Sequence, residues 1–179
     1  MVLAVLTFRG HRGFALHDGG GGSTELVKYH WSIGDMITTF AGYATPPLLG
    51  LGGAHLVAAN LPAVVLWLSV VLLVAAFLQA SNALARVVTA LAAAGVGWAA
   101  VAGEPRWQAA VAVALVWLLL IGGGLDTVRL SRGDGSDAYW LARRTLVPRI
   151  AWQAVWVAIG AVCLWKGGVL LLAERSAVG

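Results

Sequence analysis

The sequence has very little charge. Only 11% of its 179 residues are Asp, Glu, Lys or Arg, whereas 60% are hydrophobic. A soluble domain usually has about 25% charged residues, because its surface must face water. The low charge therefore excludes an ordinary soluble domain and predicts an integral membrane protein. The chain is long enough for about five spans of roughly 20 residues each, with connecting loops.

Cysteine and known catalytic motifs are also scarce. Cys163 is the only cysteine, so the chain has no disulfide framework and no Cys-based zinc site. It lies in an apolar stretch, which predicts a small buried side chain. No H-E-x-x-H, Walker or G-x-S-x-G motif occurs. The net charge of +4 is not gathered into a basic run, which argues against nucleic acid as a partner and favours the lipid bilayer.

Five apolar segments predict the fold class, an all-α membrane protein with about five transmembrane helices and a short N-terminal strand and turn segment. The segments run from about Met36 to Ala58, Pro62 to Gln79, Arg86 to Ala102, Trp107 to Leu125 and Ile150 to Ala173. The first contains Pro46 and Pro47, which a membrane helix tolerates where neighbouring groups or water satisfy the freed carbonyls. We therefore expect this helix to be kinked and packed inside the bundle.

The residues before the first span are polar and rich in glycine. The run Gly19 to Gly22 and the alternating stretch Gly13 to His17 predict short strands and a turn at the membrane surface. Met1 to Leu6 is apolar but shorter than a signal-peptide core of about 7 to 15 residues, so we expect the end of a helix there. The predicted domains are thus 1–34, a helix stump and cytoplasmic surface segment, and 35–179, a helical bundle with a cytoplasmic loop at about 127–149.

Basic residues are unequally shared between the two sides that the five spans define. The side of the N-terminal segment receives nine of them: Arg9, Arg12, Lys28, Arg86, Arg129, Arg132, Arg143, Arg144 and Arg149. The opposite side has Arg106, together with Lys166 and Arg175 near the chain end. By the positive-inside rule, the protein is predicted to be a multi-pass protein of the cell membrane with its N-terminus in the cytoplasm.

A few polar residues near the span ends are candidate functional groups, because such groups are costly at membrane depth. Asp126 and Asn82 lie at the ends of spans on the predicted cytoplasmic side. Asp126 is a candidate carboxylate ligand for a metal such as zinc, with capping of the following loop as the alternative. Asp35, at the entrance of the first span, is either a functional carboxylate or one that the helix dipole stabilises.

The histidines are weaker candidates. His55 falls near the outer end of the first span, where an interfacial histidine is ordinary. His11 and His17 are six residues apart in the glycine-rich segment. That is not the i, i+4 spacing that places two histidines on one helix face.

Several stretches carry a resemblance to a known family. They are Val2 to His17, Ala41 to Gly53 (AGYATPPLLGLGG) and Gly135 to Pro148 (GSDAYWLARRTLVP), with Asn82 where the family has an R-N-x-x-G motif. Together they resemble the B-type branch of the site-2 protease family, the intramembrane zinc metalloproteases common in actinobacteria. The resemblance covers nearly the whole chain. It implies a zinc site near the cytoplasmic face, with Asp126 where a third, carboxylate ligand would come from.

In that family, an H-E-x-x-H helix supplies two zinc-binding histidines and the glutamate that activates water. By the resemblance this helix would lie immediately before Met1, so no catalytic residue is assigned in this chain. We expect the chain as given to bind no zinc and to be inactive, either as a truncated form or as a non-catalytic relative. The alternatives are an active intramembrane metallopeptidase with a start further upstream, acting on a peptide or membrane protein, and a small transporter or structural membrane subunit.

Overall fold

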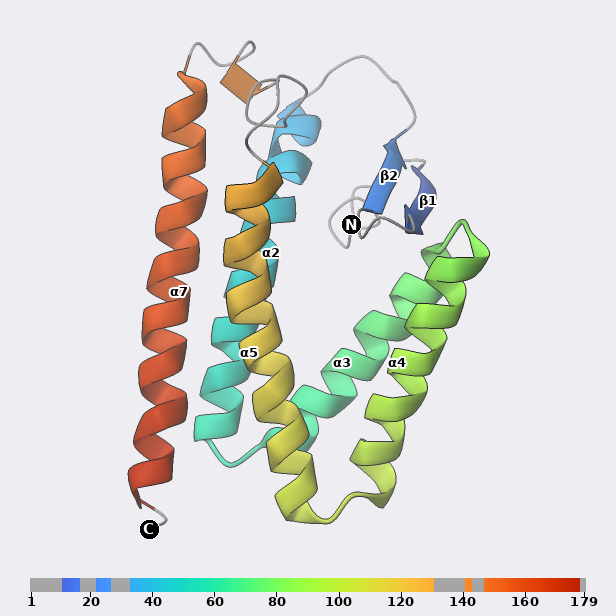
Figure 1. Ribbon diagram of the computed structural model, residues 1–179, viewed down its shortest axis with the longest axis vertical. Coiled ribbons are helices and arrows are strands. Elements are labelled where there is room, and N and C mark those ends of the chain that lie inside the picture. Colours follow the sequence, from blue (N-terminus) through green and yellow to red (C-terminus); the bar gives the residue numbers. More distant parts are fainter. Residues whose placement is uncertain (1–10, 17–21, 27–32, 131–140, 143–146, 178–179) are drawn as a thin grey trace. The chain divides into compact units, whose positions relative to one another are not determined.

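The computed structural model describes residues 11–16, 22–26, 33–130, 141–142 and 147–177 (Figure 1). Long helices dominate these residues: α2 (Ile33–Ala58), α3 (Pro62–Gln79), α4 (Ala83–Ala102), α5 (Pro105–Leu130) and α7 (Arg149–Ala177). Two short strands, β1 (His11–Leu16) and β2 (Gly22–Leu26), form an antiparallel pair within the N-terminal segment. The predicted all-α membrane architecture is confirmed.

Four of the helices have the length and composition to cross a membrane. They are α3, α4, α5 between Pro105 and Gly123, and α7 between Arg149 and Ala173. α2 is as long, but it is not one of these four helices. Its sequence includes threonines, glycines, two prolines and His55, which lower its hydropathy. Membrane crossing by α2 therefore stays a prediction.

The helices extend beyond the apolar segments that predicted them. α4 begins at Ala83, and α5 continues to Leu130. A helix can continue beyond an apolar segment because its backbone hydrogen bonds do not depend on whether the side chains are polar. Two helices begin at a proline, Pro62 and Pro105, which suits the first helical position. After α2, Asn60 adopts φ 58°, the left-handed conformation that often ends a helix.

The chain divides into two compact units, which we describe separately. Unit 1 comprises Met1–Trp31 and Leu61–Ala112, and it contains the strand pair and the antiparallel helices α3 and α4. α3 and α4 contact each other, and Val65 and Leu66 of α3 and Ala85 and Val96 of α4 are buried. β1 also contacts both helices.

Unit 2 comprises Ser32–Asn60 and Val113–Gly179. It contains α2, the C-terminal part of α5, and α7, which runs beside α2 (Figure 1). Leu120 and Val116 of α5 and Ala54 of α2 are fully buried. Cys163 of α7 is also buried, which confirms the prediction of a small buried side chain.

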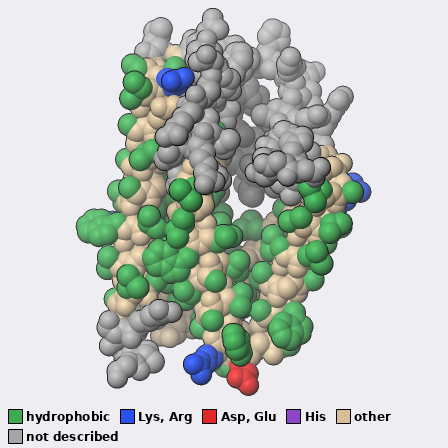
Figure 2. All heavy atoms as spheres, viewed as in Figure 1, with side chains coloured by type: hydrophobic (Ala, Val, Ile, Leu, Met, Phe, Trp, Pro, Cys, Tyr) green, Lys and Arg blue, Asp and Glu red, His purple; other side chains and the backbone are tan. Residues whose placement is uncertain are grey.

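Most of the coloured side chains on the described helices in Figure 2 are hydrophobic, and the few charged ones lie at helix ends. Large apolar residues are exposed along every span, for example Leu78 at 76% and Val101 at 73%. A soluble protein rarely exposes contiguous apolar surface on this scale. The surface is therefore suited to lipid.

Candidate functional site

The prolines of the Ala41 to Gly53 stretch lie inside α2, which continues through both of them as one helix. Proline has no N–H, so Pro46 and Pro47 remove the intrahelical donors to the carbonyls of Gly42 and Tyr43. The hydroxyl of Thr45 donates to the carbonyl oxygen of Ala41 at 2.6 Å, one residue before these two positions. These two carbonyls therefore lose their regular helical donors, an arrangement that membrane helices tolerate where neighbouring groups or water replace those donors.

α2 and α5 are in close contact at these prolines. A Cβ at Gly123 of α5 would lie 2.6 Å from Cδ of Pro47 and 3.1 Å from Cβ of Pro46. No ordinary side chain fits at that separation, so the contact depends on glycine. Pro47 is fully buried, whereas Leu48 and Leu49 next to it are 52% and 42% exposed, so only one face of this part of α2 is covered. The expected kink and the position inside the bundle stay predictions.

A second contact continues the packing one turn further along α2. A Cβ at Gly50 would lie 2.9 Å from Cγ of Leu120, and one at Gly167 of α7 would lie 2.8 Å from Cδ1 of the same leucine. Leu120 thus fills a space that two glycines leave open, one on each neighbouring helix. Small residues allow such close approach between membrane helices.

Aromatic residues connect the first turns of α7 to α2. Tyr43 stacks on Trp156 with ring centroids 4.4 Å apart, and Phe40 meets Trp152 edge-on at 6.0 Å. Leu141 and Trp156, each 2% exposed, form the buried centre of the cluster. Leu141 belongs to the Gly135 to Pro148 stretch and Tyr43 to the Ala41 to Gly53 stretch. The structure therefore brings these two stretches together.

Asp126 lies on α5 three residues after Gly123, so helix geometry places its backbone position on the face of α5 that meets α2. Asp35 lies in the first turn of α2. These positions are at the same end of unit 2, because α2 begins where α5 ends (Figure 1). The side chains of both aspartates lie outside the described structure, so a ligand role for either stays a prediction.

Asn82 is the N-cap of α4 in unit 1. Its Oδ1 accepts a hydrogen bond from the backbone N–H of Ala85 at 2.9 Å, and Arg86 Nε donates to the carbonyl oxygen of Ala80 at 3.2 Å. Capping satisfies a helix N–H that has no partner within the helix. The structure gives Asn82 this local role, and its location on the cytoplasmic side of the membrane stays a prediction.

The histidines do not form a cluster in the part of the chain that the structure describes. His11 begins β1, while His17 lies outside the described residues. His55 is exposed near the C-terminal end of α2, the end opposite to Asp35. Among the described residues, there is no group of three His, Cys, Asp or Glu side chains that could hold a metal. The described donor set therefore does not fit a zinc site.

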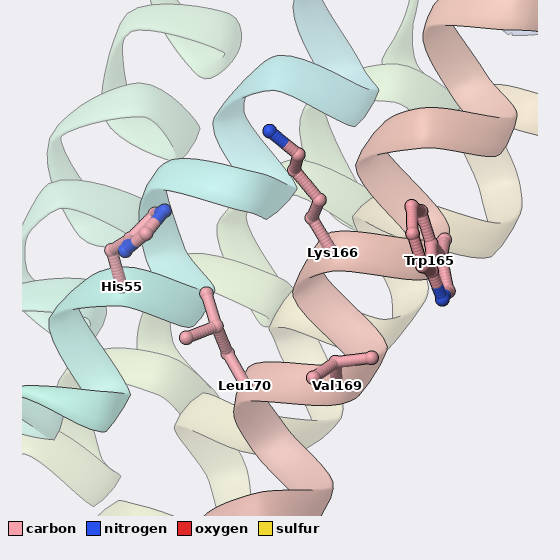
Figure 3. A pocket seen from close by; sticks show the side chains of 5 residues that line it. All are labelled: His55, Trp165, Lys166, Val169 and Leu170. Carbon is pink, nitrogen blue, oxygen red and sulfur yellow. The ribbon is translucent and has the colours of Figure 1, made fainter.

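One pocket that the sequence analysis missed lies between α2 and α7. It has a volume of about 350 Å³ and is lined by His55, Trp165, Lys166, Val169 and Leu170. Lys166 and Leu170 extend from α7 toward α2 and His55, whereas Trp165 lies farther from His55 (Figure 3). The sequence signal for it is Lys166, a cation near the end of the last span, which the sequence analysis interprets only as a topology signal.

Comparison with known families gives one match. The family described as Peptidase M50B-like matches residues 1–167. No curated protein and no solved structure matches the chain.

Proposed function

Because the chain belongs to the site-2 protease family, as a Peptidase M50B-like protein over residues 1–167, we propose that these 179 residues form the membrane scaffold of a site-2-protease-like protein. The scaffold does not hydrolyse peptide bonds by itself. The family's metallopeptidases use zinc, and the sequence contains no H-E-x-x-H motif to supply the histidines and the glutamate.

The packing around Pro46 and Pro47 is the observation that supports this role. The Ala41 to Gly53 stretch contacts Gly123 of α5 and the aromatic cluster that includes Leu141. Two of the stretches on which the family resemblance rests, Ala41 to Gly53 and the one that contains Leu141, therefore meet within unit 2. Packing of this kind holds helix ends in fixed positions, which a metal site or a bound peptide requires.

Asp126 is the residue that we propose as a metal ligand within this scaffold. A carboxylate is a suitable third ligand for a zinc ion that two histidines already hold. Within unit 2, the described histidine, His55, lies at the opposite end of α2, so the ion would take its histidines from an H-E-x-x-H helix. When that helix is supplied, the same scaffold is expected to belong to an active intramembrane metallopeptidase that cleaves a membrane-embedded peptide.

The proposed orientation places the N-terminal segment and the Asp126 end of α5 in the cytoplasm. The nine basic residues on that side support it by the positive-inside rule. The lipid bilayer is the partner that the exposed apolar helices require. Cysteine labelling from either side of intact cells, at positions such as Ser23 and Glu104, would test the orientation.

The first experiment compares the 179-residue chain with a chain extended through the in-frame codons upstream of Met1. If those codons encode H-E-x-x-H about five to ten residues before Met1, we expect about one zinc per extended chain and cleavage of a single-span substrate. The 179-residue chain should have neither. Cleavage by the 179-residue chain would contradict the proposal, and a stop codon directly upstream would favour a non-catalytic relative.

Asp126→Ala in the extended chain tests the ligand. We expect zinc content to fall severalfold, because the loss of a coordinating carboxylate lowers the affinity of the site for zinc. Glu104→Ala, which removes an exposed carboxylate at the start of α5, is the matched control and should leave zinc unchanged. Unchanged zinc in Asp126→Ala would remove this residue from the site. A transporter or structural subunit would show no zinc in either chain.

A further inference from the structure

Lys166 is the charged residue that lies deepest in a predicted membrane span. The span of α7 runs from Arg149 to Ala173, and Lys166 is seven residues before its end. In the other spans, Arg86 and Arg106 lie within the first turn. An ionisable side chain inside a span is costly and usually has a partner or a polar cavity.

The sequence offers no nearby counter-charge for Lys166. Glu174 is eight residues later on α7, a rise of about 12 Å. Asp35 and Asp126 belong to the opposite end of unit 2. Across the described residues, neither Lys166 nor His55 takes part in a recorded hydrogen bond or ion pair. Within the part of unit 2 that the structure describes, Lys166 can therefore take an anion from outside the chain as its partner.

The depth of the pocket matches the headgroup region of a bilayer. From Arg149 to Lys166 the α7 backbone rises about 26 Å, and from Asp35 to His55 the α2 backbone rises about 30 Å. These lengths are close to the hydrocarbon thickness of about 30 Å. If Arg149 and Asp35 lie near one membrane surface, Lys166 and His55 lie near the other. A lysine there can extend its ammonium group to the lipid phosphates.

The pocket also has the right chemistry for a phosphodiester. The ammonium group of Lys166 provides three donors and the imidazole of His55 provides another. Trp165, which is 71% exposed, has a ring suited to the headgroup level. Val169 and Leu170 provide apolar contacts for the start of an acyl chain. Basic pockets between membrane helices are known binding places for anionic lipid headgroups.

We propose that the pocket between α2 and α7 binds the phosphodiester headgroup of an anionic phospholipid, from the leaflet at the C-terminal ends of these helices. Lys166 and His55 bind the phosphate oxygens, and Leu170 contacts the lipid chain. The bound lipid would join two helices of unit 2 at the end opposite to Asp126. This inference does not depend on peptidase activity.

The test measures the affinity of the purified 179-residue chain in detergent for phosphatidylglycerol, by native mass spectrometry, with phosphatidylcholine as the zwitterionic comparison. We expect tighter binding of phosphatidylglycerol. Lys166→Gln should weaken it about tenfold or more, because hydrogen bonds to charged groups are the stronger ones. His55→Gln should weaken it about threefold. Lys166→Arg should retain most of the affinity, since the charge is kept.

Two further variants separate a built site from general attraction of charge. Arg106→Gln removes an exposed cation outside the pocket and should leave the affinity unchanged. Leu170→Trp fills the pocket without changing charge and should lower the affinity. Circular dichroism checks that each variant keeps its helical content. Equal losses in Arg106→Gln and Lys166→Gln, or no loss in Lys166→Gln, would overturn the proposal.

Competition with inorganic phosphate tests whether the pocket binds the headgroup of a lipid or a free phosphate ion. In excess over the lipid, it should not displace phosphatidylglycerol, because it lacks the acyl chain that Leu170 and Val169 contact. Displacement by inorganic phosphate at equal concentration would assign the pocket to a soluble anion and reject the lipid.

Discussion

The α3 and α4 pair of unit 1 and the α2, α5 and α7 group of unit 2 are built from similar apolar sequence but pack differently. In unit 1, a Cβ at Gly95 would meet nothing within 4 Å, and one at Gly97 would make only an ordinary contact with Val70 at 3.9 Å. In unit 2, Gly50, Gly123 and Gly167 stand where a side chain cannot fit. Glycine content alone therefore does not show where helices approach closely.

The close packing coincides with part of the family resemblance. The Ala41 to Gly53 stretch and Leu141 belong to unit 2, together with Asp126 and Lys166, whereas Val2 to His17 and Asn82 belong to unit 1. Unit 1 contributes the capped helix α4 and large lipid-facing surfaces. Substitutions should accordingly be most damaging in unit 2, and three pairs of variants test this from the largest expected effect to the smallest.

The largest effect is expected for Trp156→Ala in the aromatic cluster. Trp156 is 2% exposed, so its removal leaves a cavity against Tyr43 and should lower the free energy of unfolding by about 3 kcal/mol. Trp98→Ala in unit 1, at a side chain that is 72% exposed, should change it by less than about 0.5 kcal/mol. Unfolding of the detergent-solubilised chain, followed by circular dichroism, measures both. If both variants lost the same free energy of unfolding, unit 2 would not be more sensitive to substitution than unit 1.

A single methyl group tests the contact between α2 and α5. Gly123→Ala should lower the free energy of unfolding by about 1 to 3 kcal/mol, because the new Cβ meets the ring of Pro47 and something must shift. Gly122→Ala is the matched control on the same helix, where a Cβ meets nothing within 4 Å. It should be neutral or stabilising by up to about 1 kcal/mol, the difference in helix propensity. The same unfolding measurement applies. If Gly123→Ala were as stable as the unaltered chain, α2 and α5 would be farther apart at this point than the structure places them.

The smallest effect is expected in unit 1, at the cap of α4. Asn82→Ala removes the acceptor for the N–H of Ala85 and should cost about 1 kcal/mol. Asn82→Asp keeps an oxygen acceptor at the same place and should cost much less. If the aspartate variant were as unstable as the alanine variant, the role of Asn82 would go beyond capping.

Much of the fold could be predicted because hydrophobic length is a local property. The apolar segment from Pro62 to Gln79 has the same bounds as α3, since a proline begins it and polar residues follow it. The ends of α5 were less predictable, because Asp126, Thr127 and Arg129 look like loop residues by polarity yet continue the helix. Polarity marks where lipid ends, whereas backbone hydrogen bonding decides where the helix ends.

The candidate site was predicted only in part, for a related reason. The family resemblance identified the Ala41 to Gly53 stretch and the stretch that contains Leu141. It did not predict that Tyr43 stacks on Trp156 or that Pro47 contacts Gly123. Such contacts join residues about 75 to 115 positions apart. No periodicity or spacing in one segment encodes the choice of partner on another helix. The pocket at Lys166 was missed because its other wall is His55, on a helix far away in the sequence.

The sequence by itself determined that this protein resides in a membrane, that it is built of long helices and that it carries the stretches of a site-2-protease-like protein, because composition and helix length are set residue by residue. The tertiary structure decided which glycines permit close approach, which aromatic rings meet, and which lysine shares a pocket with a histidine. Those outcomes depend on side chains from separate helices filling the same space, which only the packed helices define.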